Sequence, residues 1–204
     1  MCLILNSQIN DNHVKKNDSL FDSKAEIKLN ILSALVMIPN IGIEVKVSDK
    51  LGYQLDTTAL SYDSMDGSPV HVTQIFNELR FYPRLKSNKN HRSFYIGAHW
   101  GYGMFTLRLP KFITSFVDSA PKDEGSYQSG RNTYYGITFG KKIPLKSNKF
   151  NIELFIGGGS SQSYYKNYNK FENRIYENPD SRKIFNNSGE ELIYRGGVML
   201  SYRL

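Results

Sequence analysis

Ionisable residues recur at the polar positions of alternating segments, and they are the first candidates for chemistry in this chain. Glu44, Glu78, Arg80, Glu153 and Arg195 all occupy such positions. Carboxylates and cations gathered in this way could form a proton or ion path, or a ladder of salt bridges that only supports the structure. Because an unpaired buried charge is costly, we expect these five residues to form a structural polar network.

The segment His91-Arg92-Ser93 is the second candidate, because a serine near a base could act as a nucleophile on an acyl chain. Lysines flank it, and no evident acid orients the histidine. His13, His71 and His99 do not pair at metal-ligand spacing. No glycine-rich loop opens a helix after a strand, so nothing supports nucleotide binding. We therefore expect no enzymatic activity, no catalytic residues, no cofactor and no metal site.

Composition excludes several other classes of protein. The 204 residues carry a formal net charge of +7 and a single cysteine, Cys2, so an internal disulfide or a cysteine-based zinc site is impossible. The lysines are dispersed over polar turn sequences, so nucleic acid is not an expected partner. Mean hydropathy is −0.45. No apolar run approaches the roughly 18–20 residues that a membrane-spanning helix needs.

A two-residue period from Ala25 onward is the dominant signal for the elements that position these side chains. Ile41, Ile43 and Val45, for example, alternate with Gly42 and Glu44. The eight predicted strands cover residues 26–38, 41–47, 51–62, 72–85, 93–107, 131–143, 150–165 and 190–204. We therefore expect an all-β fold, an antiparallel up-and-down β-barrel of eight strands.

The predicted connections alternate in length. Those after the second, fourth and sixth strands are short and polar, whereas 63–71, 108–130 and 166–189 are longer. Short periplasmic turns and longer outer loops are typical of transmembrane barrels of the bacterial outer membrane. An even number of strands places both termini at the rim with the short turns.

Alternation alone is equally compatible with a soluble, lipocalin-like barrel, so the side that faces lipid needs separate arguments. The polar face carries charges of both signs and many glycines, which suit a crowded lumen. The glycines are Gly97, Gly101, Gly103, Gly136, Gly140, Gly157 and Gly159. Aromatic residues near strand ends, including Phe81, Tyr82, Phe94, Tyr102 and Tyr202, are typical of girdles at a membrane interface. These features favour an apolar face toward lipid.

The last strand alternates to its final residue, as expected for the strand that closes a barrel. One face carries Leu192, Tyr194, Val198, Leu200, Tyr202 and Leu204, and the other carries Glu191, Arg195, Ser201 and Arg203. We therefore expect Tyr194 to face lipid and Arg195 to face the lumen.

Several segments carry a resemblance beyond this period: residues 28–32, 38–44, 48–50, 77–83, 95–99 and 136–140. The most specific is the Glu-x-Arg-aromatic-aromatic-Pro run within 77–83. In these segments the chain resembles a small outer-membrane barrel family of Gram-negative bacteria, of unknown function, with the general plan of the OmpA and OmpX barrels. The resemblance covers residues 26–204. It implies the fold and a location in the cell outer membrane, and it implies no activity.

We therefore divide the chain into a disordered lead-in, residues 1–24, and an outer-membrane β-barrel, residues 25–204. The lead-in lacks the basic and apolar regions of an export signal, although Leu3-Ile4-Leu5 could be a remnant of one. We expect a polar-plugged lumen without a solute pore, and a role in structure or in recognition through the outer loops. Expected partners are outer-membrane lipid, the barrel-insertion machinery and an extracellular ligand at the outer loops. A soluble ligand-binding barrel and an outer-membrane lipid-modifying enzyme remain the alternatives.

Overall fold

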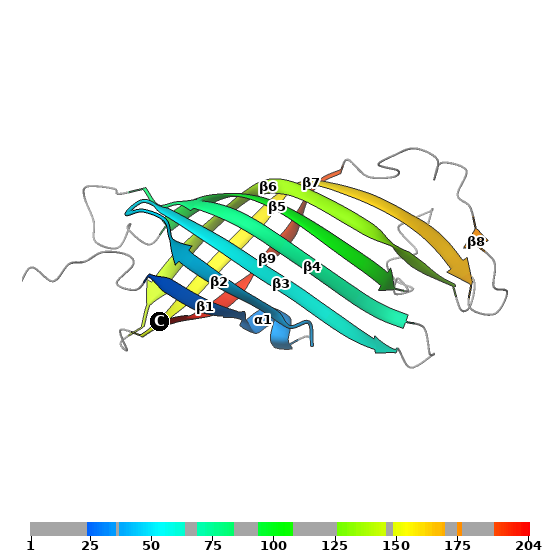
Figure 1. The fold of residues 1–204 in the computed structure, drawn as a ribbon, viewed down its shortest axis with the longest axis horizontal. Helices are drawn as coiled ribbons and strands as arrows, with labels where there is room; N and C mark the ends of the chain where they lie inside the picture. The colour runs from blue at the N-terminus through cyan, green and yellow to red at the C-terminus, as the bar shows by residue number, and fades with distance from the viewer. Residues whose placement is uncertain are drawn as a thin grey trace, which may run out of the picture.

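The computed structural model describes residues 24–35, 37–63, 69–83, 94–107, 126–145, 149–169, 175–176 and 190–204. Its strands are β1 (Ala25–Asn30), β2 (Asn40–Lys46), β3 (Leu51–Asp63), β4 (Pro69–Phe81), β5 (Phe94–Leu107), β6 (Ser126–Pro144), β7 (Phe150–Asn169), β8 (Ile175–Tyr176) and β9 (Glu190–Arg203). One short helix, α1 (Ile31–Leu35), connects β1 to β2 (Figure 1). The predicted lead-in falls on residues 1–23, outside the described residues, and on Lys24.

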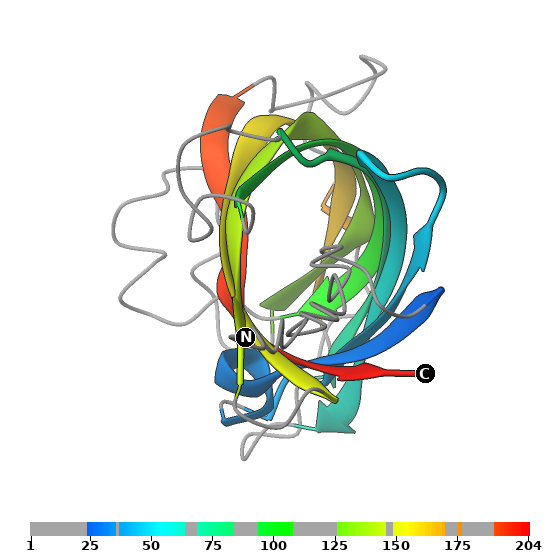
Figure 2. The same cartoon turned by 90° about the vertical axis from the view of Figure 1, so that its left-hand side faces the viewer.

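Eight antiparallel strands close into an up-and-down barrel, which confirms the predicted fold class. Each strand from β1 to β7 pairs with the next along the chain, β7 pairs with β9, and β9 pairs with β1. The two residues of β8 add only a short edge to β7. Seen along its axis, the sheet forms a ring in which the first and last strands lie side by side (Figure 2).

We call the two ends of the barrel the turn rim and the loop rim. The turn rim carries both ends of the barrel sequence, since Glu26 pairs with Arg203, together with the β2–β3, β4–β5 and β6–β7 connections. The loop rim carries the other connections. The β3–β4 connection covers only residues 64–68 and is shorter than predicted, because β4 begins at Pro69. The β4–β5 connection, residues 82–93, is the longer of the two, so the predicted alternation of short and long connections is wrong for this pair. The longest connections, 108–125 and 170–189, are at the loop rim.

The first predicted strand, residues 26–38, is wrong beyond Asn30, where the chain turns into α1. The Asn30 side chain accepts a hydrogen bond from the Ser33 backbone N–H, and the Ser33 hydroxyl donates to the Asn30 carbonyl. This is the N-cap that starts a helix. Hydrogen bonds from Met37 N to Ala34 O and from Ile38 N to Ser33 O end the helix in a Schellman motif. Among the described residues, no helix has the length and apolar character needed to cross a membrane.

The prediction that Tyr194 faces the same side as Val198 is wrong, because the pairing of β7 with β9 contains a bulge at Gly157/Gly158. Gly157 pairs with Arg195, whereas Gly158 pairs with Ile193, so Tyr194 is the extra residue. The Tyr194 hydroxyl reaches His99 inside the barrel. Both Tyr194 and Arg195 therefore face the lumen.

Candidate functional site

The half of the lumen nearer the turn rim is filled by ionisable side chains, which we call the charged layer. It consists of Glu26, Lys28, Glu44, Asp56, Glu78, Arg80, Lys142, Glu153, Arg195 and Arg203. Strand alternation puts most of them on the inner face, where they follow or precede exposed apolar residues of the outer face, and the salt bridges across the lumen place the others, such as Asp56 and Arg195. Seven of the eight barrel strands contribute to it, and β5 contributes Tyr95, which donates a hydrogen bond to Glu153.

Arg80 lies at the centre of the charged layer. Its guanidinium forms salt bridges with Glu44 at 2.8 Å, with Glu153 at 2.9 Å and with Glu78. The same group lies 4.2 Å from the ring centroid of Tyr95. The side chain of Arg80 is fully shielded from solvent, as are those of its three carboxylate partners. One cation thus links strands β2, β4 and β7 across the lumen.

Two lysines complete the layer around Arg80. Lys28 forms salt bridges with both Glu44 and Glu153. Lys142 lies 2.9 Å from a Glu26 carboxylate oxygen and 3.0 Å from Glu44. Each shared carboxylate therefore meets more than one cation, which offsets the cost of removing these charges from water.

Arg195 extends the layer toward the loop rim. It contacts Asp56 at 2.9 Å and Glu78 at 2.7 Å. Glu78 also accepts a hydrogen bond from the Thr138 hydroxyl. The five residues predicted as a network, Glu44, Glu78, Arg80, Glu153 and Arg195, are therefore all in the lumen and are linked through shared salt bridges.

Half of the charged layer was not predicted as part of this network. Glu26, Lys28, Asp56, Lys142 and Arg203 were not assigned to the network, although all fall at polar positions of the same alternation, and Arg203 was expected on the lumen face. The alternation was the available signal, and extending it to every charged polar position would have found them. Among the salt bridges of the described lumen, five cations meet five carboxylates, so their formal charges cancel.

Small residues make room for this packing. A Cβ on Gly140 would lie 2.3 Å from the ring of Tyr95, and one on Gly101 would lie 2.5 Å from the ring of Phe76. Large side chains from one strand therefore occupy the space over a glycine of the next, as expected for a filled eight-stranded barrel. The charged layer and the rings beside it are thus closely packed in this half of the lumen.

Tyr82 corrects another expectation, because it was predicted to lie in an interfacial girdle. It is almost fully buried, and its hydroxyl donates a hydrogen bond to Glu44. Its ring also packs against that of Tyr95, with the centroids 5.5 Å apart and the ring planes tilted by 50°. The residue continues the inward side of β4 one position beyond the strand, so it closes the turn-rim end of the lumen.

Aromatic side chains form the next layer toward the loop rim. The ring of Phe76 lies 5.2 Å from that of Tyr134 and 6.3 Å from that of Tyr194. The two nitrogens of His99 are both occupied, Nδ1 by the Thr138 hydroxyl at 2.8 Å and Nε2 by the Tyr194 hydroxyl at 2.6 Å. His99 therefore serves to join strands in this layer.

A cavity of about 320 Å³ lies beyond the aromatic layer, in the loop-rim half of the lumen. Its lining is uncharged and mixes apolar groups with amides and hydroxyls, including Gln74, Gln128, Asn132, Tyr134 and Tyr165. Among the described residues, the buried Oδ1 of Asn132 accepts no hydrogen bond. The described lumen therefore contains buried charged side chains in the half near the turn rim and a cavity in the half near the loop rim.

Comparison with known families places most of the chain in one family. The family model described as "Protein of unknown function (DUF3575)" matches residues 3–190. The chain belongs to the DUF3575 family. No curated protein matches it. The match spans β1 to β7 and most of the charged layer, so a barrel in a family of unknown function is confirmed, and any specific role must be argued from the geometry.

The other candidates in this DUF3575 protein gain no geometric support. The segment His91-Arg92-Ser93 lies outside the described residues, as does His13. His71 is exposed at the loop rim, where its Nδ1 lies 2.8 Å from the Ser61 hydroxyl. Within the part of the chain that the structure describes, no group of three or more metal-ligating side chains is arranged to hold an ion.

Proposed function

We propose that this DUF3575 protein is an outer-membrane β-barrel with a plugged lumen. Its role is structural, or it recognises a ligand through the loop rim, and it neither conducts solutes nor catalyses a reaction. Outer-membrane lipid surrounds it and the barrel-insertion machinery assembles it. The argument rests on one observation, the distribution of apolar and charged side chains between the two faces of the sheet.

The outer face of the barrel is apolar and exposed. Its large side chains include Ile27, Ile41, Ile43, Ile75, Leu79, Phe81, Ile96, Trp100, Ile137, Phe139, Leu154 and Ile156, each between 41% and 56% exposed. They come from β1, β2, β4, β5, β6 and β7, six of the eight barrel strands, and we call them the apolar belt. Soluble monomers rarely expose contiguous apolar patches beyond a few hundred square ångströms, so lipid is the natural solvent for this belt.

The inner face supports the same proposal. A soluble ligand-binding barrel packs apolar side chains inward and keeps charges in water, and this lumen does the reverse. Arg80, Lys28, Glu44, Glu78 and Glu153 are among its most buried side chains. In a membrane the lumen is the only protected place for polar residues, because the outer positions of the belt contact hydrocarbon.

The edges of the apolar belt carry aromatic residues, as a membrane interface favours. Near the turn rim, Phe150 and Tyr202 pack with ring centroids 5.2 Å apart. Phe94 lies beneath the Lys141 ammonium, 5.2 Å from ring centroid to Nζ. Toward the loop rim, Tyr102 and Tyr135 are exposed on the outer face. The belt is thus bounded on both sides by amphipathic side chains.

The cavity in the loop-rim half of the lumen favours a second role, the binding of a small uncharged ligand. Its volume fits a compact molecule, and Gln74, Gln128 and Asn132 offer amide groups to orient it. The charged layer closes the far end, so a ligand that enters from the loop rim would be held and not transported.

Trp100 provides the test, because it is the only tryptophan and lies half-exposed on the outer face. The full chain would be refolded into phosphatidylcholine vesicles, some of which carry bromine on their acyl chains. We expect brominated chains to quench Trp100 fluorescence strongly, and the folded barrel to migrate faster than the boiled protein on gels. A protein that stays in solution, with unquenched Trp100, would establish the soluble alternative. A Trp100→Phe variant is the control for the origin of the signal.

A further inference from the structure

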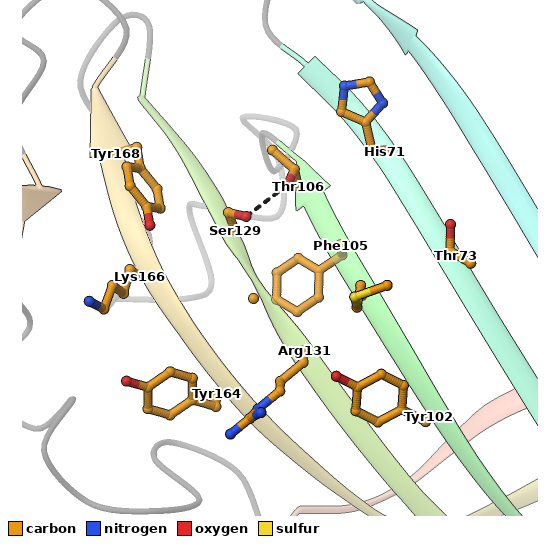
Figure 3. Close-up of a pocket in the computed structure, with 12 residues that line it drawn as sticks. His71, Thr73, Tyr102, Phe105, Thr106, Ser129, Arg131, Tyr164, Lys166 and Tyr168 are labelled. Atoms are coloured by element: carbon orange, nitrogen blue, oxygen red, sulfur yellow. Dashed lines mark hydrogen bonds between the residues drawn. The ribbon is translucent and has the colours of Figure 1, made fainter.

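A second cavity, of about 700 Å³, is an open groove on the outer wall of the barrel close to the loop rim. It crosses the ends of β4, β5, β6 and β7 (Figure 3). We call it the outer groove and define it by Tyr102, Thr106, Ser129, Arg131, Tyr164 and Lys166. It lies at the same end of the barrel as the lumen cavity, and the two linings share Met104 and Phe105.

The register shows that these side chains point away from the lumen. Arg131 pairs with Tyr164 on one side and with Met104 on the other, and Ser129 pairs with Lys166. The alternate residue Asn132 lines the lumen cavity instead. Most residues that line the two cavities are therefore of opposite parity, with the sheet between them, and only Met104 and Phe105 of the described residues line both.

The outer groove is cationic. Arg131 is exposed, Lys166 is partly exposed, and the lining contains no acidic residue. No salt bridge joins either cation to an acid elsewhere in the described chain. These two cations thus differ from those of the lumen, where every cation of the charged layer has a carboxylate partner.

Neutral donors and aromatic rings accompany the two cations. The guanidinium of Arg131 lies 5.5 Å from the ring centroid of Tyr164 and extends beside that ring (Figure 3). The hydroxyls of Thr106 and Ser129 are 2.8 Å apart, and either can turn to donate to a ligand. An arginine, a lysine and hydroxyl donors form the usual set of groups for a phosphate oxyanion.

The position of the outer groove along the barrel axis favours a lipid headgroup as the source of the anion. Along the outer face of β6, toward the loop rim, the side chains change from apolar Phe139 and Ile137 to Tyr135 and then to the cation Arg131. On β5 Tyr102 lies next to Trp100 in the same way. The cations therefore begin where the apolar belt ends, at the depth where lipid headgroups meet water.

We propose that the outer groove binds the phosphate of a phosphorylated glycolipid in the leaflet on the loop side of the membrane. Arg131 forms a bidentate contact with the phosphate and Lys166 neutralises the remaining charge, while Tyr164 and Tyr102 contact the sugar. This inference rests on the proposed membrane location. It identifies a lipid class that the location alone does not specify.

Native mass spectrometry of the full chain in detergent would test the inference with bisphosphorylated lipid A as the probe. The key variant combines Arg131→Gln with Lys166→Gln. Its matched control combines Lys141→Gln with Lys149→Gln, which removes two positive charges at the turn rim. Dephosphorylated lipid A and inorganic phosphate serve as comparison ligands.

We expect the unchanged protein and the control to retain lipid A equally, and the key variant to bind it about a hundredfold more weakly, about tenfold for each charged contact. Dephosphorylated lipid A should bind the unchanged protein as weakly as bisphosphorylated lipid A binds the key variant. Equal retention by the key variant, or full displacement of the lipid by millimolar phosphate, would overturn the inference. Brominated lipid should still quench Trp100 in the key variant. If it does while lipid A binding is unchanged, only the groove proposal fails, whereas unquenched Trp100 means that the proposed membrane location fails.

Discussion

The charge balance of the lumen makes Arg80→Met a severe change, although methionine has a comparable length and suits a buried site. The substitution removes one of five cations and leaves five carboxylates, of which Glu44, Glu78 and Glu153 lose a direct partner. Removing one partner from a buried ionic group costs about 3–5 kcal/mol, because an uncompensated charge remains. We expect the free energy of unfolding to fall by that amount.

Urea titration of the protein refolded in phospholipid vesicles would measure the loss, with Trp100 fluorescence as the signal. The rescue variant is Arg80→Met with Glu78→Gln, which restores equal numbers of buried cations and carboxylates. Glu78 keeps two partners in Arg195 and Thr138, and a glutamine can still bond to both. We expect the double variant to recover at least about 1 kcal/mol, as coupled neighbours do.

An exposed lysine provides the control. Lys50 lies in the β2–β3 turn, so Lys50→Met should change stability by less than about 0.5 kcal/mol. If Arg80→Met cost no more than Lys50→Met, or if the double variant were less stable than the single one by the full cost of Glu78→Gln, the charged layer would not be a mutually compensated network, and our reasoning about the plug would be refuted.

Three further changes test other parts of the fold by the same titration. Leu154→Arg puts a charge on the outer face and should cost about 2–4 kcal/mol in vesicles, and an unchanged midpoint would mean that this face does not meet lipid. Gly140→Val should cost about 3 kcal/mol or prevent folding, because its Cβ would lie 2.3 Å from the ring of Tyr95, and normal folding would contradict the packing described above. Met37 has φ 61° and is 80% exposed, so Met37→Gly should be about 1 kcal/mol more stable than Met37→Ala, and equal values would show that the turn after α1 adapts without strain.

Sequence patterning predicted most strands because the two faces of a barrel strand meet different surroundings, so apolar and polar residues alternate along its sequence. The prediction failed where the deciding interaction is not periodic. Ile31 to Leu35 is an apolar run too short to distinguish helix from strand, and the Asn30 cap decides in favour of the helix. The face of Tyr194 depends on a bulge against β7, and a single strand gives no sign of it.

The sequence predicted which charged residues face the lumen, but it could not predict which of them form salt bridges with one another. Lys28 and Glu153 are 125 positions apart in sequence and meet only because the barrel closes. Their pairing depends on the stagger of eight strands, which the alternation of any one strand does not contain. The outer groove was missed for a related reason. Arg131 and Lys166 are unremarkable in sequence, and only the β6–β7 register brings them to the same stretch of wall.

The pairings of β1 with β9 and with β2 are the two shortest of the ring, from Glu26 to Asn30 and from Ala25 to Leu29, whereas β6 and β7 pair from Ser126 to Pro144. The barrel is therefore closed by a short pairing between its first and last strands. A nascent chain that has not yet reached residue 190 lacks β9 and cannot close the barrel. Its β1 and β7 strands then have unpaired edges, which can pair with other molecules. Closure must therefore wait until β9 has been synthesised.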